Sequence, residues 1–285
     1  MVSTFDSGEL GPSSSPVHVR WLGTAGFEIR HGEHVLLIDP YVTRAPLLRC
    51  VARPLVPDEV RIRKYFPRAD AIIVGHTHFD HAMDVPSIAK ATGAKVYGSR
   101  SAAALCRSRG VAHAKIDVIE PEGAGPAERE VGPFSLRFHA SAHSPLLLGR
   151  VPFPGEIADC GDVPLRAEEY RCGAVFGVEI EVAGKTLFHL GSAELLEASL
   201  ERLEVDLALV CVAGWRTSER FPERAMRALS PRAALLMHWD NFLLPLEKGA
   251  RLLPAMHMDR LADRLAKEAR DVRVGVLPML GELRL

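Results

Sequence analysis

The chain has 285 residues and a formal net charge of −1, and 47% of its residues are hydrophobic. This size and composition are typical of a globular protein with one large domain or two small ones. A net charge near zero argues against nucleic acid as a partner, and no apolar run approaches the ~20 residues that integral membrane association requires. The five cysteines are scattered, odd in number and without a CxxC pair, so no disulfide framework or zinc knuckle is indicated.

Residues 1–16 are polar and rich in serine, and they have no apolar core of a secretory signal. We therefore expect a disordered leader over residues 1–16, followed by a single domain over residues 17–285 that shows no linker and no repeat. Together with cysteines that show no disulfide pattern, this predicts a cytoplasmic protein.

Three strands with short connections open the domain, at residues 17–22, 27–30 and 34–40. Asp39 stands at the end of the third strand, just before Pro40. Its carboxylate could orient a metal-bound histidine, or it could simply be a carboxylate in a turn. Residues 41–69 are irregular and rich in proline and arginine, and a loop of that length usually covers or lines a site.

Strands then alternate with helices, which predicts an α/β fold. Apolar runs and breaker residues place strands at 71–74, 95–98, 134–139, 206–212, 233–238 and 272–276, and a hairpin at 175–182 and 185–190. Helices are expected at 83–91, 101–108, 219–229 and 258–270, and a further helix is expected to open at 191–194 with Ser192 as its N-cap. Residues 121–133 are interpreted as a turn and residues 144–173 as a second long irregular segment.

Four ionisable side chains follow the buried strand at 71–74: His76, His78, Asp80 and His81. Strand side chains repeat every two residues, so His76 and His78 project from the same side. Asp80 and His81 fall where the chain can turn into a helix and approach the same point from another direction. Three imidazoles and a carboxylate suit a divalent metal better than they suit a surface turn.

The segment His76-Thr77-His78-Phe79-Asp80-His81 resembles the HxHxDH motif of the metallo-β-lactamase superfamily. Residues 21–27 and 37–40, together with the segments around His143 and His238, resemble the branch that contains ascorbate-6-phosphate lactonase and N-acylphosphatidylethanolamine phospholipase D. The resemblance implies an αββα sandwich with two metals in a cleft. His76, His78 and His143 would bind the first metal, and Asp80, His81 and His238 would bind the second.

The chain departs from that pattern at one position. The family places a metal-bridging aspartate after the glycine of a segment like His189-Leu190-Gly191, and here Ser192 stands in its place. A neutral hydroxyl is a poor ligand for a divalent cation. We therefore expect one tight metal site with three imidazoles and a second site that is weak or empty. Glu194 is the nearest carboxylate, and it is either a displaced ligand or a residue of the first helical turn.

Two further histidines lie near the motif segments. His139 is four residues before His143 and is interpreted as a neighbour of the site. His189 is expected to pack or to support a ligand from behind.

A metal held by three imidazoles, with Zn²⁺ expected and Mn²⁺ or Fe possible, lowers the pKa of a bound water to about 7. Asp80 would orient that water or accept its proton, which makes it the candidate catalytic residue. The sequence thus predicts a hydrolase of an ester, lactone, amide or phosphodiester. The alternatives are an iron-dependent redox enzyme on the same fold and a non-catalytic binding protein.

The substrate is expected to be a small molecule. Arg44, Arg53 and Arg150 are candidates for holding an anionic group, with surface arginines as the alternative. A set of apolar residues near the predicted ligands either forms a substrate pocket or packs the long loops: Leu146, Leu147, Leu148, Phe153, Trp239, Phe242, Leu243 and Leu244.

Overall fold

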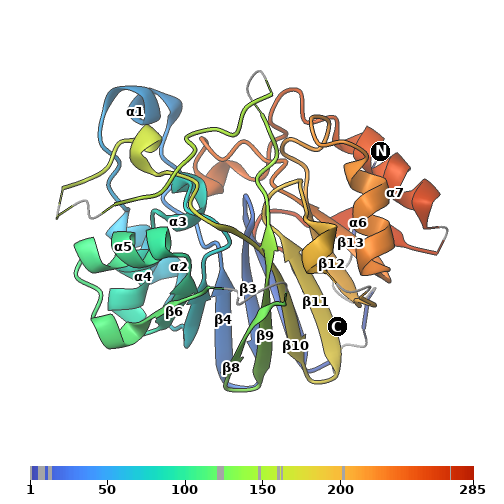
Figure 1. The fold of residues 1–285 in the computed structure, drawn as a ribbon, viewed down its shortest axis with the longest axis horizontal. Helices are drawn as coiled ribbons and strands as arrows, with labels where there is room; N and C mark the ends of the chain where they lie inside the picture. The colour runs from blue at the N-terminus through green and yellow to red at the C-terminus, as the bar shows by residue number, and fades with distance from the viewer. Residues whose placement is uncertain are drawn as a thin grey trace.

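Two β-sheets pack face to face, with helices on both outer sides (Figure 1). The computed structural model describes residues 2–5, 10–11, 15–120, 125–146, 149–158, 161, 163–200, 203–269 and 271–285. The expected αββα sandwich is confirmed by this arrangement. Each sheet buries one face against the other sheet and one face under helices, which is why so many of its strands are uninterrupted apolar runs.

The first sheet has seven strands in the order β15-β2-β3-β4-β5-β6-β7. Strands β2 to β4 form an antiparallel meander, and β4 to β7 run parallel. The bounds are β2 (Val17–Gly23), β3 (Gly26–His31), β4 (His34–Ile38), β5 (Ala71–Ile73), β6 (Lys95–Gly98), β7 (Ile116–Val118) and β15 (Glu282–Arg284).

The second sheet has eight strands in the order β1-β14-β13-β12-β11-β10-β9-β8. Strands β8 to β11 are antiparallel, and β11 to β14 are parallel. The bounds are β1 (Ser3–Thr4), β8 (Ala127–Val131), β9 (Phe134–Ser141), β10 (Val175–Val182), β11 (Lys185–Leu190), β12 (Leu207–Cys211), β13 (Ala233–Met237) and β14 (Arg273–Val276).

Helices cover the outer face of each sheet (Figure 1). On one side lie α2 (Glu59–Tyr65), α4 (Val85–Thr92) and α5 (Arg100–Ser108), and on the other α6 (Phe221–Leu229) and α7 (Met258–Glu268). The remaining helical segments lie in connections: α1 (Leu47–Ala52), α3 (Phe79–Ala82), η1 (His113–Lys115), η2 (Ala167–Glu169), η3 (Glu197–Ser199) and η4 (Leu246–Lys248).

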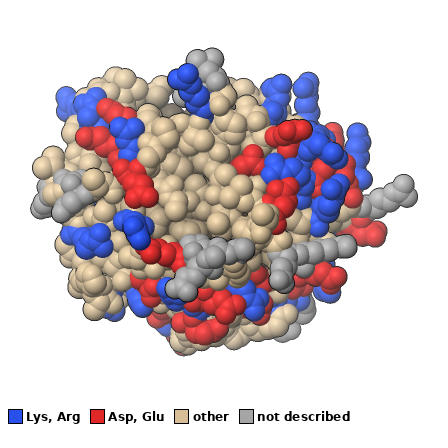
Figure 2. Space-filling model, viewed as in Figure 1, with Lys and Arg blue, Asp and Glu red and all other residues tan. Residues whose placement is uncertain are grey.

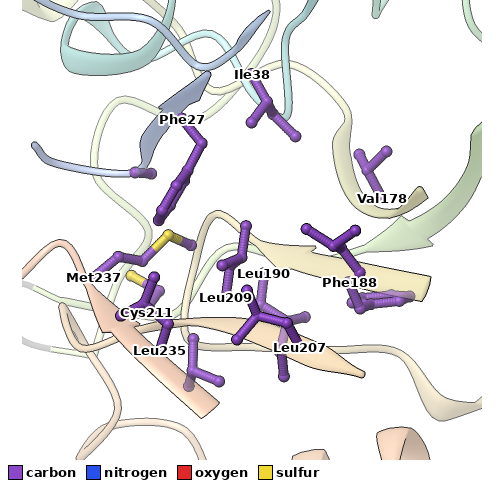
Figure 3. Packing of buried hydrophobic residues seen from close by; sticks show 14 of the residues in the cluster. Phe27, Ile38, Val178, Phe188, Leu190, Leu207, Leu209, Cys211, Leu235 and Met237 are labelled. Carbon is purple, nitrogen blue, oxygen red and sulfur yellow. The ribbon is translucent and has the colours of Figure 1, made fainter. Parts of the chain in front are cut away.

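The main core fills the space between the sheets (Figure 3). Phe27 and Ile38 of the first sheet face Phe188 and Leu209 of the second, and all four are fully buried. Burying a side chain of this size stabilises the fold by roughly 1.5–3 kcal/mol. This core fixes how the two sheets face each other, and so how the loops at their edges meet.

Several expected strands and helices end within one or two residues of their predicted bounds. Strands β6, β10 and β11 have the predicted bounds at both ends. Four expectations are wrong. Residues 41–69 contain α1 and α2, and residues 127–131 form β8 where a turn was expected. No helix opens at 191–194, where the chain stays irregular until η3.

The fourth difference concerns the expected disordered leader. Ser3 and Thr4 form β1, which pairs in parallel with β14, and the side chain of Phe5 is buried in the main core. The pairing needs a partner more than 260 residues away, which local composition does not reveal. Residues 6–9 and 12–14 of the expected leader lie outside the described residues.

Candidate metal centre

Strands of both sheets deliver their chemically active residues to the same edge of the sandwich. Asp39 follows β4, His76 follows β5, His143 follows β9 and His238 follows β13. Asp39 and His238 adopt positive φ angles of 45° and 58°. Non-glycine residues rarely adopt this conformation, and where they do it often belongs to a functional site.

His76, His78 and His143 form one candidate metal site. Their ring centroids lie 4.7 to 4.9 Å from one another, and one nitrogen of each lies within 4.8 Å of the others. His76 and His78 are buried, and His143 is half-buried. These three histidines were predicted from the sequence as one metal site. The structure brings them together from the end of β5, the start of α3 and the end of β9.

Hydrogen bonds leave one nitrogen of each ring available to a cation. Nε2 of His78 lies 2.9 Å from the carbonyl of Pro152, and Nδ1 of His143 lies 2.7 Å from the carbonyl of Ser144. A carbonyl only accepts, so each of these nitrogens donates and the opposite nitrogen keeps its lone pair. Both nitrogens of His76 are buried without a partner. Such an orphaned imidazole fits a metal ligand.

Asp80, His81 and His238 form a second candidate site beside the first. Oδ2 of Asp80 lies 3.2 Å from Nε2 of His238 and 3.8 Å from Nε2 of His81. The rings of His76 and His81 have centroids 3.8 Å apart, so the two sites adjoin. Both trios were predicted from the sequence, and each brings together side chains that could hold a divalent ion.

Asp39 orients His81 from behind. Its Oδ2 accepts a hydrogen bond from Nδ1 of His81 at 2.8 Å, and its Oδ1 accepts one from the backbone N–H of Gly75 at 2.6 Å. Of the two interpretations of Asp39 left open by the sequence, the geometry matches the one in which it orients a histidine. A side chain on Gly75 or Gly191 would press against this carboxylate, with a Cβ only 3.0 Å from Oδ2.

Burial keeps the first trio neutral. It lowers the pKa of His76 well below its usual range, that of His78 to about 4 and that of His143 to about 3. Neutral imidazole is the form that donates a lone pair to a metal. In the second trio, burial alone would raise the pKa of Asp80, but His81 and His238 hold it well below its usual range.

The pKa of His81 shifts in the opposite direction from the pKa values of the first trio, because nearby negative charge outweighs burial. Burial alone would lower the pKa of His81, but the carboxylates of Asp80 and Asp39 raise it. A third group of close possible ligand atoms, formed by Asp39, His76 and His81, joins the two trios. Among the described residues, Asp39 and Asp80 are the only carboxylates in these three groups.

Ser192 lies at this edge but points its hydroxyl at the backbone. Its Oγ accepts a hydrogen bond from the N–H of Ser144 at 3.0 Å and lies 3.2 Å from the hydroxyl of Ser144. Ser192 thus braces the segment that carries His143. It is not a helix N-cap, because the chain after it is irregular.

Glu194 is engaged elsewhere. Its Oε1 accepts hydrogen bonds from Arg224 at 2.8 Å and from the N–H of Leu195 at 3.0 Å. Of the two interpretations considered, neither a displaced ligand nor a residue in a first helical turn matches this position.

Arg44 was a candidate for binding an anionic substrate, and the structure contradicts that role. Its guanidinium is fully buried and donates to Oδ2 of Asp240 at 2.6 Å. Asp240 in turn accepts from the N–H of Thr24 at 2.8 Å, and the carbonyl of Thr24 accepts from the N–H of His238 at 2.8 Å. Arg44 therefore holds the loop that carries His238.

Asp240 is a residue that sequence reasoning missed. It comes two residues after His238, and a carboxylate next to a predicted ligand was the available signal. The same loop is anchored by Trp239, which stacks on Trp21 with ring centroids 5.2 Å apart. The segment at residues 21–27 thus contacts the loop that carries His238.

The other arginines, histidines and apolar residues that the sequence singled out differ in their exposure and contacts. Arg53 and Arg150 are exposed. His139 lies in a separate cluster, 3.0 Å from Glu179, and belongs to none of the groups of possible metal ligands among the described residues. His189 is buried and bonds the carbonyl of Ala25 at 2.8 Å. Of the apolar set, Leu147 and Leu148 lie outside the described residues, Trp239 is buried, and Leu146, Phe153, Phe242, Leu243 and Leu244 keep exposed surface.

An αββα sandwich with a three-histidine trio beside a trio of one aspartate and two histidines is the architecture expected of a class of metal-dependent enzymes. Residues 34–240 match the family model described as the beta-lactamase superfamily domain, and the chain therefore belongs to this superfamily. The UPF0173 metal-dependent hydrolase of Symbiobacterium thermophilum is 28% identical to the chain over 235 residues, which are 79% of this chain and 85% of that protein. The chain is thus a metal-dependent hydrolase of the metallo-β-lactamase superfamily, as its sequence motifs predicted.

Two solved structures share the fold at low sequence identity. Igni18, a metallo hydrolase from Ignicoccus hospitalis, has a TM-score of 0.57 at 16% identity, over 94% of this chain and 99% of that one. CmlA, a diiron β-hydroxylase from Streptomyces venezuelae, has a TM-score of 0.58 at 15% identity, over 96% of this chain and 55% of that one. No helix among the described residues is long and apolar enough to cross a membrane.

Proposed function

We propose that the protein hydrolyses an ester, lactone, amide or phosphodiester of a small molecule with one tightly held metal ion, Zn²⁺. His76, His78 and His143 would hold this ion, and Asp80, His81 and His238 would form a weaker site. The supporting observation is Ser192, which donates no charge to the centre and is hydrogen-bonded to Ser144 instead. Among the groups of possible ligands in the described part of the chain, the carboxylates of Asp80 and Asp39 alone would offset the charge of two adjacent dications.

A bound metal activates a water molecule and polarises the bond to be cleaved. The chain's own residues position the reactants. Asp80 only accepts hydrogen bonds in its ionised form, so it orients the attacking water and is the proposed catalytic residue. Asp39 keeps His81 in the tautomer whose Nε2 faces the centre. The hydrogen bonds to Pro152 and Ser144 fix the other two tautomers, which leaves Nδ1 of His78 and Nε2 of His143 with a free lone pair.

Metal analysis of the purified protein tests the number of tight sites. We expect one equivalent of zinc per chain after dialysis against a mild chelator. Two equivalents that survive the same dialysis would overturn the single-site proposal. His76→Ala should lose the metal, and His34→Ala, which changes an exposed histidine, should keep it.

Hydrolysis of aryl esters and aryl phosphodiesters tests the reaction type. We expect activity in the zinc-loaded protein, loss of activity in His76→Ala and normal activity in His34→Ala. Iron with an absorbing chromophore and no hydrolysis would favour a redox enzyme, which is the reaction class of CmlA. A protein that binds metal but turns over neither kind of substrate would favour a binding role.

A further inference from the structure

Phe153 lies beside the candidate metal centre in a strained conformation. Its φ angle is 41°, in the left-handed region that bulky side chains rarely adopt, and its side chain remains 37% exposed. A strained residue persists only where its surroundings hold it there, and such residues cluster at functional sites.

Backbone hydrogen bonds fix Phe153 in this position. Its carbonyl accepts from the N–H of Cys172 at 2.9 Å, and the carbonyl of Gly155 accepts from the N–H of Gly173 at 2.9 Å. The carbonyl just before it, of Pro152, accepts from His78 at 2.9 Å. The Phe153 ring is thus tied to a candidate metal ligand, and its centroid lies 6.2 Å from that of His78 in an edge-on arrangement.

A second aromatic ring flanks the other candidate site. Phe242 contacts His238 edge-on with centroids 5.4 Å apart, and it lies 6.2 Å from Phe79. Phe242 and Phe79 are half-buried. Each trio of candidate ligands therefore has a phenyl ring beside it that retains exposed surface.

The ring contacts of Phe153 and Phe242 are with imidazole and phenyl groups, which suits an uncharged, apolar ligand. Of the three arginines considered for an anionic partner, Arg44 is buried in its ion pair with Asp240, and Arg53 and Arg150 are exposed. From the end of β9 the chain rises to the top of the molecule and crosses toward α1 and α5 (Figure 1). On the face of the molecule seen in Figure 2, Lys, Arg, Asp and Glu side chains gather mainly toward the edges.

We propose that Phe153 and Phe242 form an apolar platform that binds the acyl or aryl group of the substrate next to the metal. The assignment rests on the proposed function, because the group belongs to the molecule that is hydrolysed. The two rings supply apolar area on either side of the centre, and rigidity at Phe153 lowers the ordering cost of binding.

Binding of straight-chain carboxylates to the zinc-loaded protein tests the platform without turnover. Acetate, butanoate, hexanoate and octanoate would be titrated by calorimetry. We expect affinity to rise about threefold to fourfold per methylene while the chain lies on the rings. In Phe153→Ala and Phe242→Ala this rise should flatten, while acetate binds as before. Leu48→Ala, which trims a side chain 80% exposed on α1, serves as the control. An unchanged slope in both ring variants would overturn the proposal.

Thermal unfolding distinguishes a ligand-binding role of the Phe153 ring from a role in packing the loop. Phe153→Gly removes the ring at a backbone conformation that glycine adopts without strain. We expect this variant to keep its zinc and its unfolding temperature while it loses the chain-length dependence. A large fall in unfolding temperature would assign the ring to packing and contradict the proposal.

Hydrolysis of aryl esters with the same acyl chain lengths tests the platform and the proposed reaction independently. Hydrolysis that does not depend on chain length would contradict the platform and leave the proposed hydrolysis intact. Chain-length-dependent binding without hydrolysis of any ester, lactone, amide or phosphodiester would support the platform and contradict the proposed reaction.

Discussion

Asp39 and His81 form a buried hydrogen bond of 2.8 Å between Oδ2 and Nδ1, across 42 residues of sequence. The same carboxylate accepts the N–H of Gly75 just before the metal motif. One side chain at the end of β4 thus sets both the path of the chain into the motif and the orientation of a histidine within it. This arrangement leads to the first of four predictions.

Asp39→Asn should weaken the second metal site and spare the first. The amide has one accepting oxygen for two donors, so either His81 or Gly75 loses its partner. Loss of such an orienting group typically costs 10–100-fold in metal affinity. Competition with a chromophoric chelator measures both sites separately. An equal loss at both sites would show that Asp39 acts on the whole centre.

Ser192→Asp should increase the metal content. A carboxylate at this position adds a negative charge beside two candidate cation sites and can still accept the N–H of Ser144. We expect the tightly held metal to rise from one equivalent per chain toward two, measured by elemental analysis after dialysis.

Ser192→Ala is the matched control for that experiment. It removes the hydroxyl without adding charge, so the metal content should stay at one equivalent. A similar gain in both variants would mean that loss of the bond to Ser144, and not the new charge, changes the centre.

Arg44→Met should destabilise the fold, because it leaves Asp240 buried without its partner. Breaking a buried ion pair on one side typically costs about 3–5 kcal/mol. The free energy of unfolding in urea gives the loss, and Arg53→Met, which changes an exposed arginine, should cost little. If Arg44 instead bound substrate, its replacement would raise KM and leave the unfolding free energy nearly unchanged.

Glu179 should contribute to stability in a pH-dependent way. Burial alone would raise the pKa of Glu179, but its bonds to His139 and Arg137 lower it below the usual value. A group with a lowered pKa in the folded state stabilises the fold above the pKa of the unfolded chain, and the contribution is lost as pH falls through the folded pKa.

We therefore expect unfolding free energy to fall as the pH drops below about 4.5, and Glu179→Gln to show a shallower fall. Urea unfolding at a series of pH values measures the slope. Glu181→Gln, which changes a more exposed partner of the same Arg137, is the control. Identical slopes in wild type and Glu179→Gln would contradict the linkage.

The sequence located both candidate trios because their ligands belong to short motifs at strand ends. It erred where a side chain's role depends on a distant partner. Arg44 stood in an irregular loop, and nothing local showed that Asp240, 196 residues later, would enclose it. Ser192 had the local features of an N-cap, yet its hydrogen bonds go to Ser144 on another strand end.

Most strand and helix positions, the superfamily motif and the candidate metal ligands follow from the order of the residues, since apolar periodicity and motif spacing act over a few positions. The contacts between segments that are distant in the sequence were decided by the packing of the two sheets. It made β1 a strand by giving it β14 as a partner, and it brought Asp39 behind His81. It also left Phe153 strained and exposed beside His78. Each of these depends on groups that meet only when distant segments pack together, and no local pattern contains that information.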